Sequence, residues 1–282
     1  MVKLIQRLAW AAAITAAFGA TAMATENSKS LAVKAVTELF GNKDVTAVDR
    51  YFGPAYRQHN LTVADGIEGL KGLAGALAAN PAFKAIPHRV IADGDLIAFQ
   101  STYEGFGPVP LVAFDIFRVD GGRIVEHWDA LAPVTLPNPS GHTQVDGPTQ
   151  VADLDRTGAN RTLVKDFVST ILVGAQYDKL PDFIDADKYA QHNSNIADGL
   201  AGLGAAIEAL GKQGIKMEYF KLHRVIAEGN FVLTQSEGAF GGKPTAYCDL
   251  FRVEAGKIVE HWDVMQPILS PADAKKNKNN MF

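Results

Sequence analysis

Two histidine–aspartate pairs, His127 with Asp129 and His261 with Asp263, are the residues of this sequence best suited to chemistry. One residue separates the members of each pair, so on a β-strand both side chains point to the same face. Histidine and aspartate serve as general acids and bases, because burial can move either pKa toward neutrality. No Ser, Cys or Lys stands in a motif that would activate it as a nucleophile. The pattern favours proton transfer or water activation over covalent catalysis.

Both pairs stand in a stretch that occurs twice. DIFRVDGGRIVEHWD covers residues 115–129 and DLFRVEAGKIVEHWD covers residues 249–263, with eleven of the fifteen positions identical. Two further segments repeat at nearly the same offset: YRQHN (56–60) with YAQHN (189–193), and HRVIADGD (88–95) with HRVIAEGN (223–230). The chain is therefore a tandem duplication.

The repeated stretch predicts a β-hairpin, because β-branched and aromatic runs flank Asp120-Gly121-Gly122, a turn sequence. Strict alternation along the second strand divides its side chains between two faces. Val125, His127 and Asp129 share one face, and Ile124, Glu126 and Trp128 share the other. A packed sheet prefers Val or Ile where this strand carries His and Asp. We therefore expect this polar face either to contact solvent or to have a functional role.

Helical patterns precede strand patterns in each copy. In the first copy we expect a helix capped by Ser30, a short helix over 45–52 and a third from Gly66 to Asn80. Strands are expected over 89–92, 96–103, 109–119 and 124–130, with YRQHN as a further short strand. Helices grouped before strands indicate the α+β class. A curved sheet around helices would leave a cavity that the polar residues could line.

Composition and charge narrow the function. With 282 residues and 47% apolar content, the chain can bury two ordinary cores. The net charge of −4, with interspersed signs, gives no basic surface for nucleic acid. The single cysteine, Cys248, excludes an intrachain disulfide and any cysteine-based metal site. We expect it to pack as a small hydrophobe.

The first residues resemble a secretory signal, with Lys3 and Arg7 before an uncharged run that ends in Ala22-Met23-Ala24. The alternative is a membrane anchor, but the strongly apolar part is too short to span a bilayer. We therefore predict export to the periplasm or medium, with no membrane association after cleavage. The predicted segments are a signal peptide (1–24), unit 1 (25–135), a linker rich in Pro and Gly (136–158), unit 2 (159–270) and a polar basic tail (271–282).

The helices followed by YxQHN, HRVIADGD and FRVxxGxIVEHWD resemble the SnoaL-like branch of the NTF2-like superfamily, in particular the predicted SnoaL-like aldol-condensation enzymes. The resemblance covers both units. It implies two tandem cone-shaped α+β barrels, each with three helices followed by a curved antiparallel sheet. In related polyketide cyclases and limonene epoxide hydrolases, an acidic residue on the last strand takes or gives a proton, a place that Asp129 and Asp263 occupy here. The Arg that the epoxide hydrolases hold between two acids has no counterpart, which argues against epoxide hydrolysis.

The candidate catalytic residues are thus Asp129, His127, Asp263 and His261. Side chains that could contact a ligand are His59, Asn60, His88, Trp128, His192, Asn193, His223 and Trp262. Purely structural roles stay open as alternatives. Each His–Asp pair could be a structural hydrogen bond, His88 and His223 could stabilise the fold, and the tryptophans could be core residues. We predict no cofactor and no metal, since no metal-binding spacing supports a site built from His59, His127 and Asp129.

Two functional interpretations follow. In the first, each barrel binds a small, largely apolar carbonyl compound, and the last-strand Asp and His catalyse an aldol, cyclase or isomerase reaction. In the second, the barrels bind a small hydrophobic ligand without changing it. For the architecture we predict an intrachain pseudo-dimer, in which the apolar outer faces of the two sheets pack together about a pseudo-twofold axis.

Overall fold

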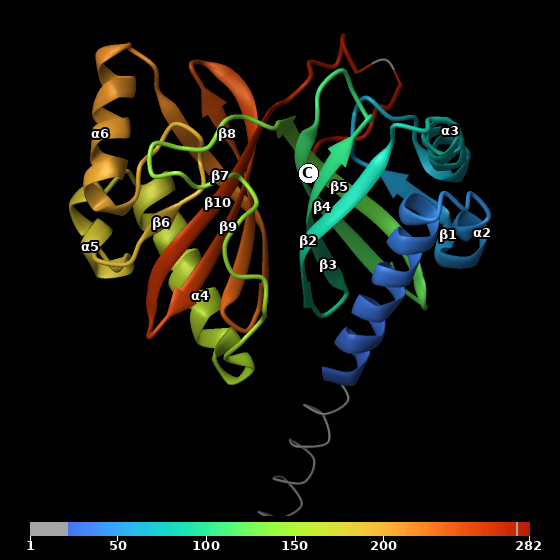
Figure 1. Cartoon of the computed structure of the whole chain (residues 1–282), viewed down its shortest axis with the longest axis horizontal. Coiled ribbons are helices and arrows are strands. Elements are labelled where there is room, and N and C mark those ends of the chain that lie inside the picture. Colours follow the sequence, from blue (N-terminus) through green and yellow to red (C-terminus); the bar gives the residue numbers. More distant parts are fainter. Residues whose placement is uncertain (1–21, 275) are drawn as a thin grey trace, which may run out of the picture.

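The computed structural model describes residues 22–274 and 276–282, and these residues form two α+β units side by side (Figure 1). Residues 22–36 are helical. The other elements of unit 1 are η1 (Thr37–Gly41), α2 (Ala47–Tyr51), β1 (Phe52–Gln58), α3 (Gly66–Ala79), β2 (Lys84–Asp93), β3 (Leu96–Glu104), β4 (Leu111–Asp120) and β5 (Arg123–Pro133). Helices precede the meander in unit 1, as predicted.

Unit 2 repeats this order. After η2 (Leu154–Arg156) its elements are α4 (Thr157–Phe167), η3 (Val168–Val173), η4 (Tyr177–Lys179), α5 (Leu180–Phe183), β6 (Ala190–Gln191), α6 (Gly199–Lys212), β7 (Met217–Glu228), β8 (Phe231–Phe240), β9 (Lys243–Glu254) and β10 (Lys257–Pro267). The α+β class predicted from the sequence is therefore confirmed.

Of the helix boundaries predicted in unit 1, those of the third helix are confirmed and the start of the first is wrong. Helix α3 begins after Asp65 and ends before Asn80, as the Asp-Gly and Asn-Pro signals predicted. The cap predicted at Ser30 is wrong, because the helix already includes residues 22–29. Ser28 shows why a serine does not mark this start: its hydroxyl donates to the carbonyl oxygen of Ala24 one turn back, which a helix interior allows.

Each sheet has five strands, in the orders β1-β5-β4-β3-β2 and β6-β10-β9-β8-β7. Four strands of each form the predicted antiparallel meander. The fifth, from YRQHN or YAQHN, pairs in parallel with the last strand. The further short strand predicted from YRQHN is present, and because it pairs in parallel, both sheets are mixed. This pairing places the YxQHN segment beside the strand that carries His127 or His261.

A β-bulge changes which side chains share a face of β5. Arg118 pairs with Glu126, but Val119 pairs with Ile124, so Val125 is an extra residue in the strand. Ile124 consequently packs in the inner core with Val119. The prediction that Ile124 shares a face with Glu126 and Trp128 is wrong for this reason. Unit 2 has the same irregularity between Ile258 and Glu260.

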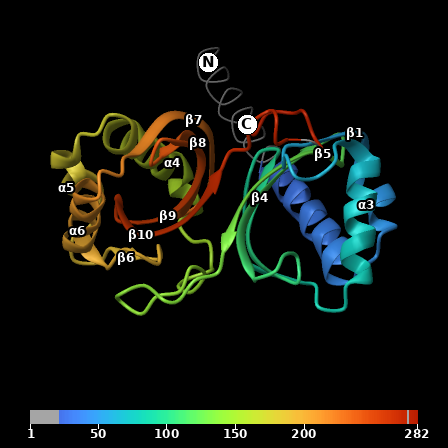
Figure 2. The ribbon, with the colours of Figure 1, turned by 90° about the horizontal axis from the view of Figure 1, so that it is seen from above.

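The outer faces of the two sheets pack against each other in the middle of the molecule, with helices α3 and α6 far from the contact (Figure 2). The buried apolar cluster at this contact contains Ile91, Ala98, Val112, Phe114, Ile116, Trp128 and Ala130 from unit 1, and Ile226, Phe231, Leu233, Cys248, Leu250, Trp262 and Val264 from unit 2. This is the contact that the sequence predicted for the outer faces, and Cys248 packs in it as a small hydrophobe.

Two arginines show the pseudo-twofold character of this contact. The guanidinium carbon of Arg224 lies 3.7 Å from the ring centroid of Trp128, and that of Arg89 lies 4.2 Å from the ring centroid of Trp262. Each arginine belongs to one unit and each tryptophan to the other. Such cation–π contacts are worth about 0.5–2 kcal/mol each, so they add to the apolar burial.

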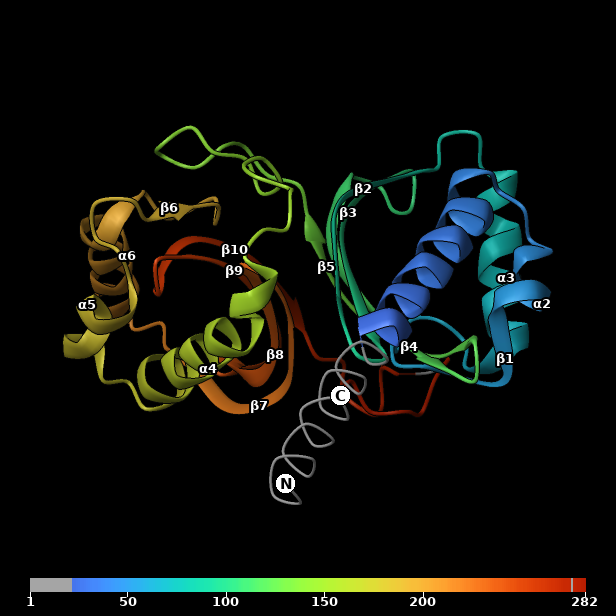
Figure 3. The ribbon, with the colours of Figure 1, turned by 90° about the horizontal axis from the view of Figure 1, so that it is seen from below.

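The linker and the tail each cross to the opposite unit (Figure 3). The Asn138 side-chain amide donates to the carbonyl oxygen of Gln191 at 2.5 Å, and that of Asn277 donates to the carbonyl oxygen of Gln58 at 2.7 Å. Both segments therefore use an asparagine to hold the strand that precedes the HN pair. The crossings fasten each unit to its neighbour in addition to the sheet contact.

Most of the predicted signal peptide lies outside the described residues, since these begin at residue 22. Among the described helices, none combines the length and the apolar character needed to cross a bilayer. Export stays a prediction.

Candidate active site

Each unit holds a cavity between its helices and the inner face of its sheet. The cavity volume is about 40 Å³ in unit 1 and about 470 Å³ in unit 2. The polar side chains that correspond in the two linings are Tyr56, Gln58, Asn60, Tyr103, Asp115, His127 and Asp129 in unit 1, and Tyr189, Gln191, Asn193, Tyr219, Asp249, His261 and Asp263 in unit 2. Most of the other lining residues are apolar, so both cavities suit a small and largely apolar molecule.

His127 lies between two oxygen acceptors. Its Nε2 is 3.2 Å from Asp115 Oδ1, and its Nδ1 is 3.0 Å from Gln58 Oε1. Gln58 Oε1 also accepts the backbone N–H of Asn60, which fixes it as the oxygen of the amide. Burial alone would lower the pKa of His127, but the hydrogen bond to Asp115 and the nearby carboxylates raise it above its usual value. The acceptor oxygens at both ring nitrogens and the raised pKa together favour the cationic form of His127.

Asp129 lies opposite Asp115 on the neighbouring strand. Within the described part of the chain, only one of its two carboxyl oxygens makes a hydrogen bond. Oδ2 accepts a hydrogen bond of 2.8 Å from the Asn60 amide, whereas the buried Oδ1 has no hydrogen-bond partner among the described residues. Burial raises the pKa of Asp129 to about 6, against the lowering effect of His127. A carboxyl group with such a pKa and a free oxygen can both take and give a proton near neutral pH.

Unit 2 repeats this geometry around the larger cavity. His261 Nε2 is 3.1 Å from Asp249 Oδ1, and its Nδ1 is 3.1 Å from Gln191 Oε1. Asp263 Oδ2 accepts from the Asn193 amide at 2.7 Å. Burial raises the pKa of Asp263, while the hydrogen bond to Asp249 raises that of His261 in spite of its burial. The Asp, His and Asn predicted from the sequence, Asp263, His261 and Asn193, therefore lie together in one site.

A family model for the SnoaL-like domain matches the chain twice, over residues 33–127 and 164–261. The chain belongs to the SnoaL-like family. Both matched segments begin within the first helix of a unit, contain the YxQHN segment and end at the histidine of the last strand. A search of curated proteins found no match.

Three solved structures are similar to this chain over 38% of its length, about the size of one SnoaL-like unit. TsrD from Streptomyces laurentii is 20% identical over 38% of this chain and 88% of its own, with a TM-score of 0.34. An NTF2-like protein of unknown function from Mesorhizobium loti is 18% identical over 38% and 93%, with a TM-score of 0.35. An M. tuberculosis LEH-like epoxide hydrolase is 25% identical over 38% and 84%, with a TM-score of 0.34.

Three residue types of the SnoaL-like site did not stand out in the sequence: Asp115 and Asp249, Gln58 and Gln191, and Tyr103 and Tyr219. The aspartates carried a signal, because each opens the duplicated stretch and interrupts an apolar strand. The glutamines stand inside the repeated YxQHN. The tyrosines carried none, because Tyr103 reaches Asp115 from β3, whereas Tyr219 reaches Asp249 from β7.

Six of the predicted ligand contacts do not line either cavity: His59, His88, Trp128, His192, His223 and Trp262. Because consecutive strand residues point to opposite faces, Gln58 faces the cavity and His59 faces outward. His59 stacks on Trp128 with ring centroids 4.9 Å apart, and His192 stacks on Trp262 at 4.5 Å.

The other two histidines lie on β2 and β7. His88 Nε2 is 2.8 Å from Thr102 Oγ1, and His223 Nε2 is 3.0 Å from Glu237. The His223 ring also stacks on Phe282 of the tail. All six residues therefore support the sheets or the crossing segments.

The acid/base groups of each SnoaL-like unit are close enough to hold a metal ion, since the possible ligand atoms of Asp115, His127 and Asp129 lie within 4.8 Å of one another. A metal-bound imidazole needs one ring nitrogen with a free lone pair. His127 Nδ1 faces the Gln58 amide oxygen and its Nε2 faces Asp115, and His261 has the corresponding partners Gln191 and Asp249. Metal ligands must be deprotonated, whereas burial raises the pKa of Asp129 and Asp263. The arrangement therefore suits proton transfer better than metal binding.

Proposed function

We propose that this SnoaL-like protein binds a small, largely apolar carbonyl compound and catalyses a proton transfer on it, of the aldol, cyclase or isomerase type. The observation that carries the proposal is the carboxyl group of Asp263, whose pKa is raised by burial, at the wall of a largely apolar cavity of about 470 Å³. Its counterpart Asp129 also has a pKa raised by burial, but it lines the much smaller cavity of unit 1.

The proposed reaction begins when the ionised Asp263 takes a proton from the carbon next to the substrate carbonyl. The negative charge moves from the carboxylate to the enolate oxygen, where the cationic His261 lowers its energy. Protonation of Asp263 is favoured by its burial. The acid then returns the proton to another atom in an isomerisation, or to the new alkoxide after the enolate carbon has attacked a second carbonyl. Asn193 holds the carboxyl group in place throughout.

Unit 2 is the unit we propose to bind the substrate. Ligand cavities commonly measure about 300–1,000 Å³, a range that includes the unit 2 cavity. The unit 1 cavity of about 40 Å³ has room for little more than water. Although the site occurs twice, we expect each chain to bind one substrate molecule, in unit 2.

The test replaces Asp129 and Asp263 together by Asn in the full chain. Turnover of a panel of small carbonyl compounds should fall by about 10²–10⁴-fold, the usual contribution of a general acid or base. The circular dichroism spectrum should stay that of the wild type. Asp155→Asn, on the exposed turn before α4, serves as the matched control. Full activity in the double variant would contradict the assignment.

The alternative is a binding module, for which the largely apolar unit 2 cavity would suffice. Mass spectrometry of compounds extracted from the native protein separates the two. A supplied compound recovered unchanged favours binding, and a product distinct from it favours catalysis. We also propose that the protein is exported, from the Lys3 and Arg7 start and the small residues before Glu26. Fractionation of producing cells tests this.

A further inference from the structure

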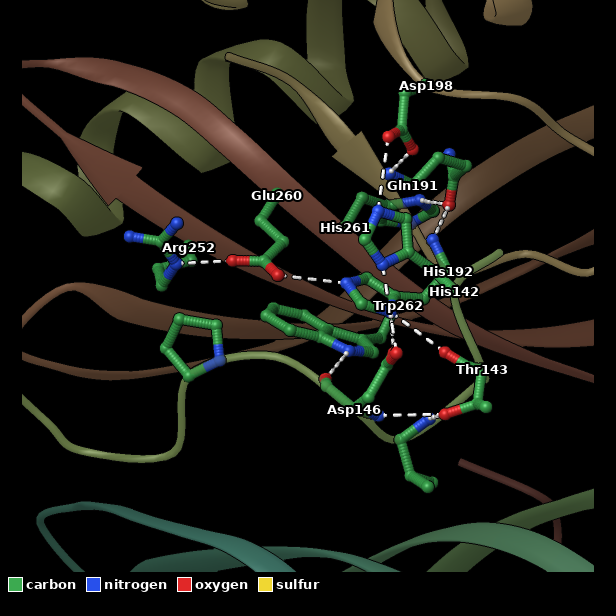
Figure 4. Close-up of polar contacts among 12 residues, drawn as sticks. His142, Thr143, Asp146, Gln191, His192, Asp198, Arg252, Glu260, His261 and Trp262 are labelled. Atoms are coloured by element: carbon green, nitrogen blue, oxygen red, sulfur yellow. Dashed lines mark hydrogen bonds and ion pairs between the residues drawn. The ribbon is translucent and has the colours of Figure 1, made fainter. Parts of the chain in front are cut away.

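Three potential metal ligands meet where the linker lies on unit 2: His142 and Asp146 from the linker, and His192 beside β6 (Figure 4). Their ligand atoms all lie within 4.8 Å of one another. Asp146 Oδ1 is 2.8 Å from His192 Nδ1, and Asp146 Oδ2 is 3.7 Å from His142 Nδ1. In a tetrahedral zinc site with bonds of about 2.0–2.1 Å, donor atoms are about 3.3 Å apart. The two measured separations lie on either side of this value.

Both histidines have a carboxylate at the ring nitrogen that faces away from Asp146. His192 Nε2 is 2.9 Å from Glu260, and His142 Nε2 is 3.1 Å from Asp198. A metal-binding histidine almost always donates its second N–H to a carboxylate or a carbonyl, which fixes the ring and leaves the other nitrogen free for the metal. Here both rings are fixed with Nδ1 toward the same aspartate.

The surroundings fix the inner ligand and leave a place for positive charge. The His192 side chain is fully buried, and Arg252 holds Glu260 through its other oxygen. Asp146 Oδ1 is buried and lies 2.8 Å from His192 Nδ1, but this contact lacks the geometry of a hydrogen bond. A metal ion between the oxygen and the ring nitrogen would give both a well-aligned partner. Without a metal, His192 Nδ1 donates instead to the carbonyl oxygen of Thr143.

We propose that His142, Asp146 and His192 bind one zinc ion, with the fourth position open to water. Two imidazoles and a carboxylate suit zinc and similar borderline cations better than calcium or magnesium, which prefer oxygen ligands. The site belongs to unit 2 alone. In unit 1 the corresponding His59 Nδ1 meets the carbonyl oxygen of Asn280, and residues 274–282 contain no His, Asp or Glu.

The ion would fasten the linker to the wall of the larger cavity. His192 stands between Gln191 and Asn193, whose side chains hold His261 and Asp263 in the candidate active site. Zinc should therefore stabilise the unit 2 site as well as the crossing of the linker. This inference does not depend on the proposed reaction, because metal binding is measured without substrate.

The test uses the untagged full chain after treatment with a chelator. Titration with zinc chloride in a calorimeter should show one site per chain, and cobalt substitution should give the visible absorption of four-coordinate Co²⁺. His142→Ala should abolish this binding, and Asp198→Asn should weaken it about 10–100-fold. Asp263→Asn is the matched control, because it alters the other His–Asp cluster of unit 2 and should leave zinc binding unchanged.

The outcomes separate the two clusters. Loss of binding in Asp263→Asn but not in His142→Ala would overturn the proposal, as would no binding up to millimolar zinc. His142 is about one-third exposed, so its replacement should leave the fold intact, which circular dichroism checks. Where that variant does not fold, the weaker binding expected for Asp198→Asn decides.

Discussion

Asp129 should make the protein less stable as the pH rises, and its replacement by Asn should remove that effect. In the folded chain burial raises the pKa of this carboxyl group to about 6, from an ordinary value of 3.8. Each pKa unit corresponds to about 1.4 kcal/mol, so ionisation of Asp129 costs the folded state about 3 kcal/mol. Because the folded pKa is the higher one, stability falls as the pH rises from about 4 to 6, and the loss is complete above pH 6.

The Asn side chain keeps one interaction and loses the charge. Its amide oxygen can accept from Asn60, as Asp129 Oδ2 does, while its amide nitrogen takes the place of Oδ1, which has no partner among the described residues. A buried amide without a partner costs about 1 kcal/mol. We therefore expect Asp129→Asn to stabilise the protein by about 2 kcal/mol at pH 8 and to destabilise it by about 1 kcal/mol at pH 4.

The measurement is guanidinium unfolding of both full-length proteins between pH 4 and 8. A ¹³C NMR titration of labelled aspartate reads the Asp129 pKa directly. Asp155→Asn, at an exposed position, should leave the pH dependence of wild type unchanged. If Asp129→Asn destabilised the protein equally at both ends of the pH range, burial of the charge could not be the cause and the reasoning would be refuted.

Two further predictions concern the contact between units and the linker. Residues 159–282 expressed alone should form a dimer or aggregate, because the outer sheet face is then exposed; a fragment that sedimented as a monomer at high concentration would contradict the pairing. Gly94→Ala and Gly229→Ala should differ in thermal unfolding, although both glycines have positive φ. A β carbon at Gly94 meets nothing within 4 Å and costs about 1–2 kcal/mol, whereas one at Gly229 meets the Ala152 oxygen at 2.0 Å and should cost more.

Periodicity and the duplication predicted the class, the order of elements and the last-strand residues of the site. The alternation rule placed His127 and Asp129 together on one face, and the structure has them there. The same rule failed at Ile124, because a bulge at Val125 inserts a residue that a period of two cannot include. Local patterns report strand periodicity, whereas a bulge depends on pairing with the next strand.

The roles of His59 and His192 show a second limit. A histidine beside an amide in a repeated motif suggests a pocket residue. Whether Gln58 or His59 faces the cavity, however, depends on the register of β1 against β5. Gln58 pairs with His127, and that register places Gln58 inside and His59 on Trp128. The crossing of the linker and the tail, which holds both histidines from outside, has no local signal at all.

The linings of the two cavities differ in the strand that supplies the tyrosine and in one loop. In unit 1 Tyr103 pairs with Ala85, whereas in unit 2 Gly238 stands at the corresponding place and Tyr219 pairs with it. Each tyrosine reaches the aspartate of its own site, so the hydroxyl is kept although its strand differs.

The loop completes the difference. Between β3 and β4 the chain of unit 1 has six residues that include Phe106, whereas β8 and β9 are joined by Gly241-Gly242 alone. Phe106 lines the unit 1 cavity and packs on Tyr103 with ring centroids 5.9 Å apart. Its removal should open the small cavity while Tyr103 keeps its bond to Asp115.

Phe106→Ala should therefore give unit 1 a cavity that admits an apolar ligand. We expect an environment-sensitive apolar dye to bind at one site per chain in wild type and at two in the variant, as read by titration at known protein concentration. Phe106 is only partly buried, so the cost should fall below the 3–5 kcal/mol of a fully buried Phe→Ala change. A folded variant that still bound one dye would show that Phe106 does not close the cavity. In that case the residue that fills the cavity would be the fully buried Phe83, whose ring stacks on Tyr103 in the core.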